Sequence, residues 1–133
     1  PGNYTFLSKF AKNTFVFPQL TNSRSMIYID NLSEFIYQLI FNKESGIFHP
    51  QDSNYVNTSN MVSEIAKVHK RRIIFTEIGG YILRLLIGKH NLYKKVFGDL
   101  FYNESLSNYK DNSYQKVDFN KAIKITEKGK SND

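Results

Sequence analysis

Arg24 is the residue whose type and position best suit chemistry toward a ligand. It is the first arginine of the chain, and it stands between the polar residues Thr21-Asn22-Ser23 and the apolar run Ser25–Ile29. A guanidinium group presents several N–H donors in a fixed planar fork, which matches the oxygens of a phosphate in two contacts. The same position is also typical of a solvated loop arginine. The residue alone therefore leaves an anion contact and a surface role open.

Signatures of other chemistries are missing from the sequence. It contains no Gly-rich loop of the dinucleotide or P-loop kind, no G-x-S-x-G elbow and no cysteine. The three histidines His49, His69 and His90 are far apart and form no H-E-x-x-H pattern, so a histidine metal site has no local support. We interpret Asp52 and Asp99 as loop or turn residues rather than as catalysts.

The basic charge of the chain raises the question of nucleic acid. The net charge is +6, but one dense cluster stands out, Lys67–Arg72, at the end of a predicted helix. Cations at that end complement the helix dipole. We therefore expect a solvated helix end, and we do not expect nucleic acid as a partner. A non-enzymatic module that binds anions or nucleic acid through this cluster stays open as an alternative.

The apolar spacing predicts alternating helices and strands. Helices are expected at residues 4–12, 31–42, 58–68, 78–87 and 118–127, a helical turn at 92–97, and extended or strand segments at 15–17, 25–29, 46–49, 73–76 and 100–102. Asn31 followed by Glu34 indicates a capping box, Thr58 or Ser59 is expected to cap the third helix, and Asp118 the last.

These elements predict a mixed α/β fragment. The run from Ser25 to His49 fits a right-handed βαβ unit, yet two strands are too few for an independent parallel sheet. We expect one domain over residues 1–127 and a polar tail over residues 128–133. The absence of cysteine fits a reducing compartment, and no apolar stretch reaches the ~20 residues that a membrane-spanning helix needs. We therefore expect a cytoplasmic protein with no membrane partner.

The run Arg24-Ser25-Met26-Ile27-Tyr28-Ile29-Asp30-Asn31-Leu32 resembles a motif of the extended short-chain dehydrogenase/reductase family, the NAD-dependent epimerases and dehydratases. UDP-glucose 4-epimerase is the best-known member. The likeness continues at Gly46–His49, at Thr58–Val68, at the Gly98-Asp99 step with Leu100–Tyr102, and at the helix from Asp118. It covers nearly the whole chain and is most specific at Arg24–Leu32. Asn31 departs from the family, which usually has Asp there.

The resemblance implies a nucleotide-sugar site. Arg24 would contact the diphosphate of a UDP-sugar or other nucleotide sugar, and Asp99 and Tyr102 would line the sugar side. A second diphosphate arginine is usual just before the Gly-Asp step, and Lys95 stands in that region instead. A lysine keeps the charge but loses the bidentate geometry.

The resemblance also implies a missing catalytic half. In the family, the N-terminal half supplies the NAD loop and a Tyr-x-x-x-Lys pair, and no tyrosine of this chain is followed four positions later by lysine. We expect the chain to be the C-terminal, substrate-binding part of an epimerase, or of a dehydratase or reductase of the same fold, without bound NAD and inactive alone. The apolar residues Phe35, Ile36, Leu39, Ile47 and Phe48 would lack most of their sheet, so self-association is expected.

Overall fold

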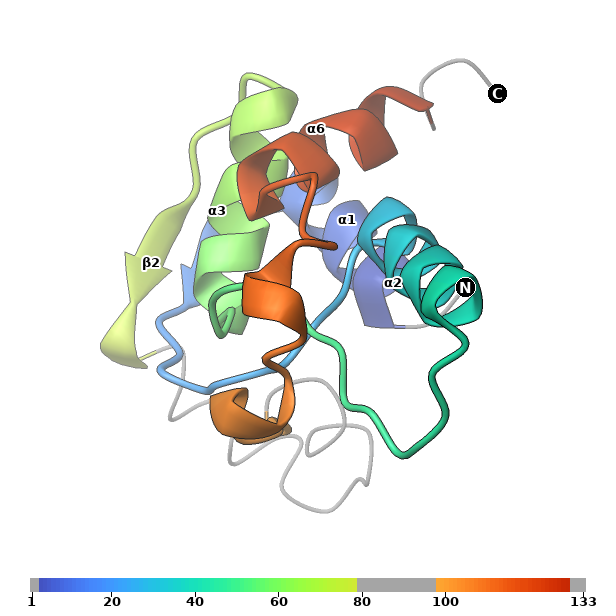
Figure 1. The fold of residues 1–133 in the computed structure, drawn as a ribbon. Coiled ribbons are helices and arrows are strands. Elements are labelled where there is room, and N and C mark those ends of the chain that lie inside the picture. Colours follow the sequence, from blue (N-terminus) through green and yellow to red (C-terminus); the bar gives the residue numbers. More distant parts are fainter. Residues whose placement is uncertain (1–2, 79–97, 130–133) are drawn as a thin grey trace.

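The computed structural model describes residues 3–78 and 98–129. Within these residues the chain is a mixed α/β unit with four α-helices and one two-stranded parallel sheet (Figure 1). The elements follow in the order α1 (Asn3–Asn13), β1 (Val16–Pro18), α2 (Ile29–Asn42), α3 (Thr58–Val68), β2 (Ile74–Thr76), two 3-10 helices (Glu104–Leu106 and Lys110–Asn112) and α6 (Phe119–Gly129). The predicted mixed α/β class is confirmed.

The main core forms where α3 packs against α1 and α6 (Figure 1). Each of these helices repeats buried apolar residues three or four positions apart, so one stripe of each faces inward. The buried residues of this core are Leu7, Ala11, Phe17, Val56, Met61, Val62, Ile65 and Ile123. The predicted helices at 4–12, 58–68 and 118–127 are thereby confirmed.

In the described part of the chain, the sheet consists of β1 and β2. Val16 pairs with Ile74, and Pro18 pairs with Thr76, in parallel register. The strand at 73–76 was predicted, and residues 15–17 were predicted to run extended. Phe17 turns inward and lies edge-on to Phe10 and Phe75, which ties the sheet to the main core.

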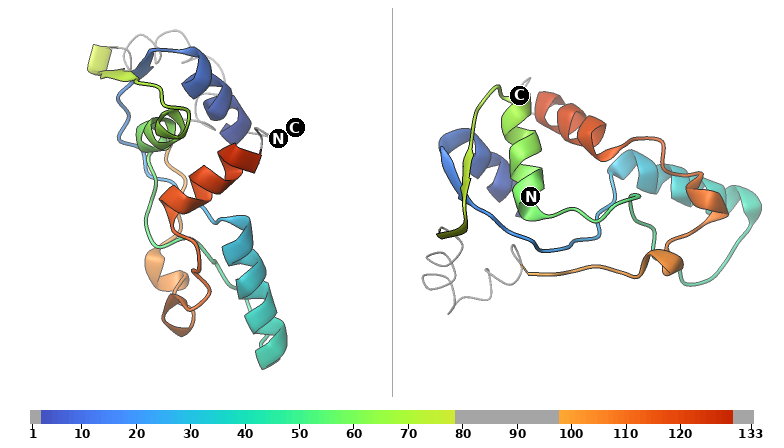
Figure 2. Two further views of the ribbon diagram at one scale, coloured as in Figure 1. Left: turned by 90° about the horizontal axis from the view of Figure 1, so that it is seen from above. Right: turned by 90° about the vertical axis from the view of Figure 1, so that its left-hand side faces the viewer.

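A second, smaller core holds α2. Phe35 lies edge-on to Tyr109 and Tyr114, with ring centroids 5.2 and 5.1 Å away, and Phe48 joins them. Both views of Figure 2 show α2 extending away from the other three α-helices, beside the segment that carries the 3-10 helices. One side of α2 is therefore covered by the second core, and much of the rest is exposed.

Three predicted strands are wrong. Residues 25–28 and 46–49 form no strand, Ile29 already belongs to α2, and Leu100 takes part in a single bridge without a strand around it. The local β propensity of these segments is real, but within residues 3–78 and 98–129 no strand pairs with them to complete a ladder. The predicted βαβ unit from Ser25 to His49 is wrong as well, because the parallel pair joins β1 to β2.

The predicted cap of α2 is also wrong. Tyr28 occupies the cap position without a side-chain hydrogen bond, and Asn31 lies inside the first turn, fully buried. In α3 the capping side chain is that of Asn57, which accepts from the Asn60 N–H. Asp118 caps α6 as predicted, since its Oδ1 accepts from the Lys121 N–H at 2.9 Å.

Two predicted segments lie outside the described residues. They are the helix expected at 78–87, of which only Ile78 is described, and the turn expected at 92–97. Lys128 and Gly129 belong to the last turn of α6 rather than to a tail. Among the described residues, no helix combines the length and the apolar character that crossing a membrane requires.

Candidate functional site

Arg24 lies where three segments of the chain meet. Its backbone forms an antiparallel bridge with Val56 through two hydrogen bonds of 3.0 Å, and a parallel bridge with Leu100. The second bridge consists of the Ser25 N–H donating to the Leu100 carbonyl and the Leu100 N–H donating to the Ser23 carbonyl, both at 2.9 Å. Arg24 is thus fixed from both sides although it belongs to no strand.

The guanidinium of Arg24 is partly engaged. Its Nη1 donates to the carbonyl of Gly98 at 2.8 Å. Among the described residues, its other N–H groups have no hydrogen-bond partner, and the side chain is half-buried. One bond to a main-chain carbonyl orients the fork, and the remaining donors are left for an anion.

A cavity of about 250 Å³ lies next to Arg24. Its lining comes from α1, from the segment that follows Arg24 and from the start of α3. Both polar and apolar residues line it: Asn3, Tyr4, Leu7, Arg24, Ser25, Met26, Ile27, Val56, Asn57, Thr58 and Met61. Its size is slightly below the range usual for small-molecule sites, so it suits a fragment of a larger ligand.

Asp99 and Tyr102 are neighbours of Arg24 but do not line this cavity. Asp99 Oδ1 accepts from the Ser23 N–H at 2.7 Å, which fixes the loop just before Arg24. The Tyr102 N–H donates to Ser25 Oγ at 2.8 Å, just after Arg24. Asp99 therefore holds the residue before Arg24, and Tyr102 holds the residue after it. Lys95 lies outside the described residues.

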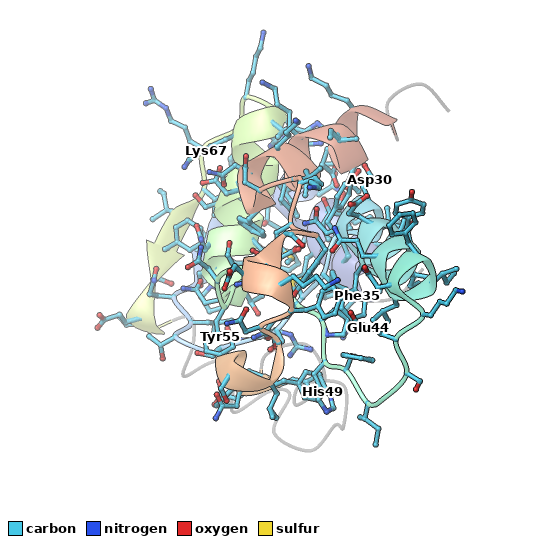
Figure 3. The ribbon with its side chains drawn as sticks, in the orientation of Figure 1. Asp30, Phe35, Glu44, His49, Tyr55 and Lys67 are labelled. Atoms are coloured by element: carbon cyan, nitrogen blue, oxygen red, sulfur yellow. The ribbon has the colours of Figure 1, made fainter. Side chains whose placement is uncertain are left out.

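Tyr102 also belongs to a small aromatic surface. The residue is 51% exposed, and its ring stacks on His49 with the ring centroids 4.9 Å apart and the ring planes at 26°. Tyr55 donates its hydroxyl to the Tyr102 carbonyl at 2.7 Å. His49 and Tyr55 lie at the same lower side of the molecule in Figure 3. The spacing of these three residues along the sequence gives no signal that they meet.

A second cavity, of about 490 Å³, lies between the loop at 52–56 and the start of α6. Asp52 lines it, and this carboxylate accepts from the Tyr28 N–H at 3.0 Å and from Asn31 Nδ2 at 2.7 Å. Burial raises the pKa of Asp52, while these two hydrogen bonds act in the opposite direction. Asp52 is more than the plain loop residue that the sequence suggested, because it anchors the start of α2.

Glu127 forms a buried polar cluster that the sequence analysis missed. It is 1% exposed, and it accepts hydrogen bonds from Tyr4 at 2.8 Å and Ser8 at 2.9 Å. Lys12 Nζ and His69 Nε2 lie 2.9 and 2.8 Å from its Oε2. Burial raises its pKa, but the four hydrogen bonds outweigh burial and lower it to about 2.

This cluster has the character of a structural contact. Glu127 comes from α6, Tyr4, Ser8 and Lys12 come from α1, and His69 follows α3. A signal was present in the sequence, because Glu127 stands four residues after Ile123, on the inward face of α6.

Three side chains of the basic cluster Lys67–Arg72 make contacts within the chain. Lys67 pairs with Glu64, His69 contacts Glu127, and the guanidinium of Arg71 lies 4.9 Å from the centre of the Phe15 ring. Lys70 and Arg72 of the same cluster are exposed.

Metal ligands do not gather in the described part of the chain. No group of three or more His, Asp or Glu side chains there is arranged to hold an ion. What the site offers is an oriented guanidinium, flanking aromatic rings and two cavities.

Comparison of the chain with protein-family models, with curated proteins and with solved structures finds no match in any of the three.

Proposed function

We propose that this chain is the nucleotide-sugar-binding part of an NAD-dependent epimerase of the extended short-chain dehydrogenase/reductase family, similar in kind to UDP-glucose 4-epimerase. One observation carries the proposal. Arg24 donates to the Gly98 carbonyl, and its neighbours Ser23 and Ser25 are hydrogen-bonded to Leu100. Arg24, Asp99 and Tyr102 therefore lie in one neighbourhood, although Arg24 is far from the other two in sequence. The family resemblance names these same residues as a substrate site.

Arg24 holds the diphosphate in this proposal. Its Nη1 is fixed on the Gly98 carbonyl, and its remaining N–H groups point to no described partner. A charge-assisted contact to a diphosphate contributes on the order of 1.5–3 kcal/mol. Because the fork is already oriented by Gly98, little side-chain freedom is lost when the ligand binds.

The residues on either side of Arg24 take different roles. Tyr102 offers a half-exposed ring, backed by His49, on which the base or sugar of the ligand can stack. Asp99 is a positioning residue. Its carboxylate accepts a hydrogen bond from the Ser23 N–H and thereby fixes the loop that precedes Arg24.

The reaction itself requires a second half of the molecule. Since the sequence has no Tyr-x-x-x-Lys pair and no Gly-rich loop, we assign the catalytic groups and NAD to that half. When bound, NAD would accept and return a hydride at the sugar. A dehydratase or reductase of the same family would hold its substrate in the same way. We also propose a cytoplasmic location, in keeping with the absence of cysteine.

The exposed side of α2 supports a partner half. Ile36, Tyr37, Ile40 and Phe41 are all exposed on this helix, and Tyr37 stacks on Phe41. An apolar surface of this kind marks an interaction site. In the proposal it is covered by the cofactor-binding half.

The direct test is to map binding on the chain by NMR. UDP and UDP-glucose are titrated separately into the isotope-labelled protein, and the backbone amide shifts are followed. The proposal predicts saturable shifts at Arg24, Ser25, Asn57 and Tyr102. Glucose 1-phosphate, which lacks the nucleoside, should bind more weakly. Absence of any saturable shift with UDP and UDP-glucose at millimolar concentration would overturn the proposal.

A further inference from the structure

The larger cavity has a chemical character different from that of the Arg24 site. It occupies about 490 Å³ where the loop at 52–56 meets the start of α6. Of its lining residues, Val56 alone also lines the cavity next to Arg24. Its polar lining consists of carboxylates, side-chain amides and hydroxyls, contributed chiefly by Asp52, Asn54, Tyr55, Asn60, Gln115 and Asn120.

Several of these groups are held in place by the fold. Asp52 is fixed by the Tyr28 N–H and by Asn31, as described above. Gln115 donates through Nε2 to the Gln51 carbonyl at 2.9 Å, and Tyr55 donates to the Tyr102 carbonyl at 2.7 Å. Figure 3 shows Tyr55 on the same side of the molecule as His49. Asp52, Gln115 and Tyr55 are thus held in place around the cavity by hydrogen bonds to other parts of the chain.

Other groups are left to bind a ligand. In the described part of the chain, the side-chain amides of Asn54, Asn60 and Asn120 make no hydrogen bond, and all three residues are exposed. Each amide offers two N–H donors and one carbonyl acceptor. Together with the Asp52 carboxylate, they place hydrogen-bond donors and acceptors around one cavity.

The charge of the lining excludes an anionic ligand. No lining residue is Lys, Arg or His, and two are aspartates, Asp52 and Asp118. The N-terminus of α6 is also capped, because Asp118 Oδ1 accepts a hydrogen bond from the Lys121 N–H at 2.9 Å. A phosphate would therefore meet the negative charge of the aspartates here without a compensating positive charge among the lining residues.

The remaining lining is apolar and aromatic. Tyr55 and Phe119 each contribute a ring, next to Val56 and Val117. A pyranose sugar carries hydroxyl groups, which amides and carboxylates can hydrogen-bond. It also has apolar C–H faces, which aromatic rings can cover. We propose that this cavity binds a neutral hexopyranose, at a site separate from the one that holds the nucleotide sugar.

The test uses methyl α-D-glucopyranoside and methyl α-D-galactopyranoside, which are neutral and cannot open. NMR titration of the labelled chain should give saturable shifts at Asn54, Asn60, Gln115 and Asn120 for at least one sugar, with a Kd in the millimolar range. Cyclohexanol, which has the ring but not the hydroxyl pattern, should leave these amides unchanged. A parallel titration with UDP reports on the Arg24 site, so failure of either proposal is seen separately.

Two variants locate the sugar. Asn60→Ala and Asn120→Ala remove exposed amides, so folding should be unaffected and the melting temperature serves as the check. Each should weaken sugar binding by about three- to tenfold, the effect of one neutral hydrogen bond. Asn108→Ala is the matched control, an exposed asparagine outside the lining, and should bind as the parent chain does. The proposal is overturned if neither sugar shifts the cavity amides, or if both variants bind like the control.

Discussion

Glu127 keeps its negative charge inside the packed helices because four side chains donate to it. We predict that Glu127→Gln lowers the free energy of unfolding by about 2–3 kcal/mol, since the neutral amide loses charge-assisted bonds to Lys12 and His69. Urea denaturation gives the value. The control is Glu64→Gln, which breaks the more exposed Lys67 pair and should cost less than about 1 kcal/mol. Equal losses in the two variants would contradict the structural role of Glu127.

The same residue predicts a dependence of stability on pH. The pKa of Glu127 is lowered from 4.5 to about 2 in the folded chain, so the folded state binds fewer protons than the unfolded state between these values. Its contribution is complete above pH ~5 and is lost as the pH falls toward 2. Denaturation curves from pH 6 to 2 should therefore show a steeper loss of stability for the parent chain than for Glu127→Gln. Parallel curves would show that Glu127 does not carry the effect.

Asn31 joins α2 to two distant segments. Its Nδ2 donates to Asp52 Oδ1 at 2.7 Å and to the Val117 carbonyl at 2.8 Å, and its Oδ1 accepts from the N–H groups of Lys116 and Val117. Asn31→Ala would leave these groups buried without partners, at a cost of about 2–4 kcal/mol. Thermal melting should register a large drop, whereas Asn13→Ala, at an exposed asparagine, should change little. A melting temperature that Asn31→Ala leaves intact would contradict this role.

At the scale of the elements, the turn at Lys110–Asn112 carries strain. All three residues have positive φ, at 45°, 52° and 59°, a region that side chains other than glycine adopt reluctantly. Asp111 is exposed, so Asp111→Gly should relieve strain and raise the free energy of unfolding by about 0.5–1 kcal/mol. Lys124→Gly, placed in the helical interior of α6, should lower it by a similar amount. If Asp111→Gly destabilises like Lys124→Gly, the left-handed turn is not present in solution.

The elements also show what local sequence determines. The helix α6 was predicted, because Asp118 marks its start and Phe119, Ala122 and Ile123 follow at helical spacing. Such signals lie in the sequence because helix formation depends on contacts within a few residues. Ser25–Ile29 and Gly46–His49 were predicted as strands on propensity alone, and propensity does not supply a pairing partner.

The candidate site was predictable to a similar extent. The family resemblance pointed to Arg24, Asp99 and Tyr102, and the fold places them as neighbours. The bond from Arg24 to Gly98 and the stack of Tyr102 on His49 depend on tertiary packing that no spacing rule contains. Asn31 was interpreted as a cap because Asn is a good capping residue. Its spacing from Phe35, four residues later on the buried face, pointed to the interior.

At the scale of the whole molecule, the exposed apolar side of α2 governs behaviour in solution. Ile40 and Phe41 are each 72% exposed. Without a covering partner, such a surface should drive self-association. Light scattering over a range of concentrations should show a rising mass for the parent chain and a constant monomer mass for the double variant Ile40→Lys, Phe41→Lys. Ile125→Lys, at an exposed apolar position on α6, is the control and should behave like the parent. A parent chain that stays monomeric throughout would contradict the expectation.

The central claim is that this chain holds a nucleotide sugar through the guanidinium of Arg24. Calorimetry with UDP-glucose on the parent chain, Arg24→Lys and Arg24→Ala tests it most directly, with Arg72→Ala as a control at an exposed arginine. A loss of ~2 kcal/mol corresponds to roughly thirtyfold weaker binding for Arg24→Ala, and Arg24→Lys should recover only part of it because the ammonium lacks the fork. Arg72→Ala should bind as the parent does. Equal affinities for the parent chain and Arg24→Ala would contradict the claim.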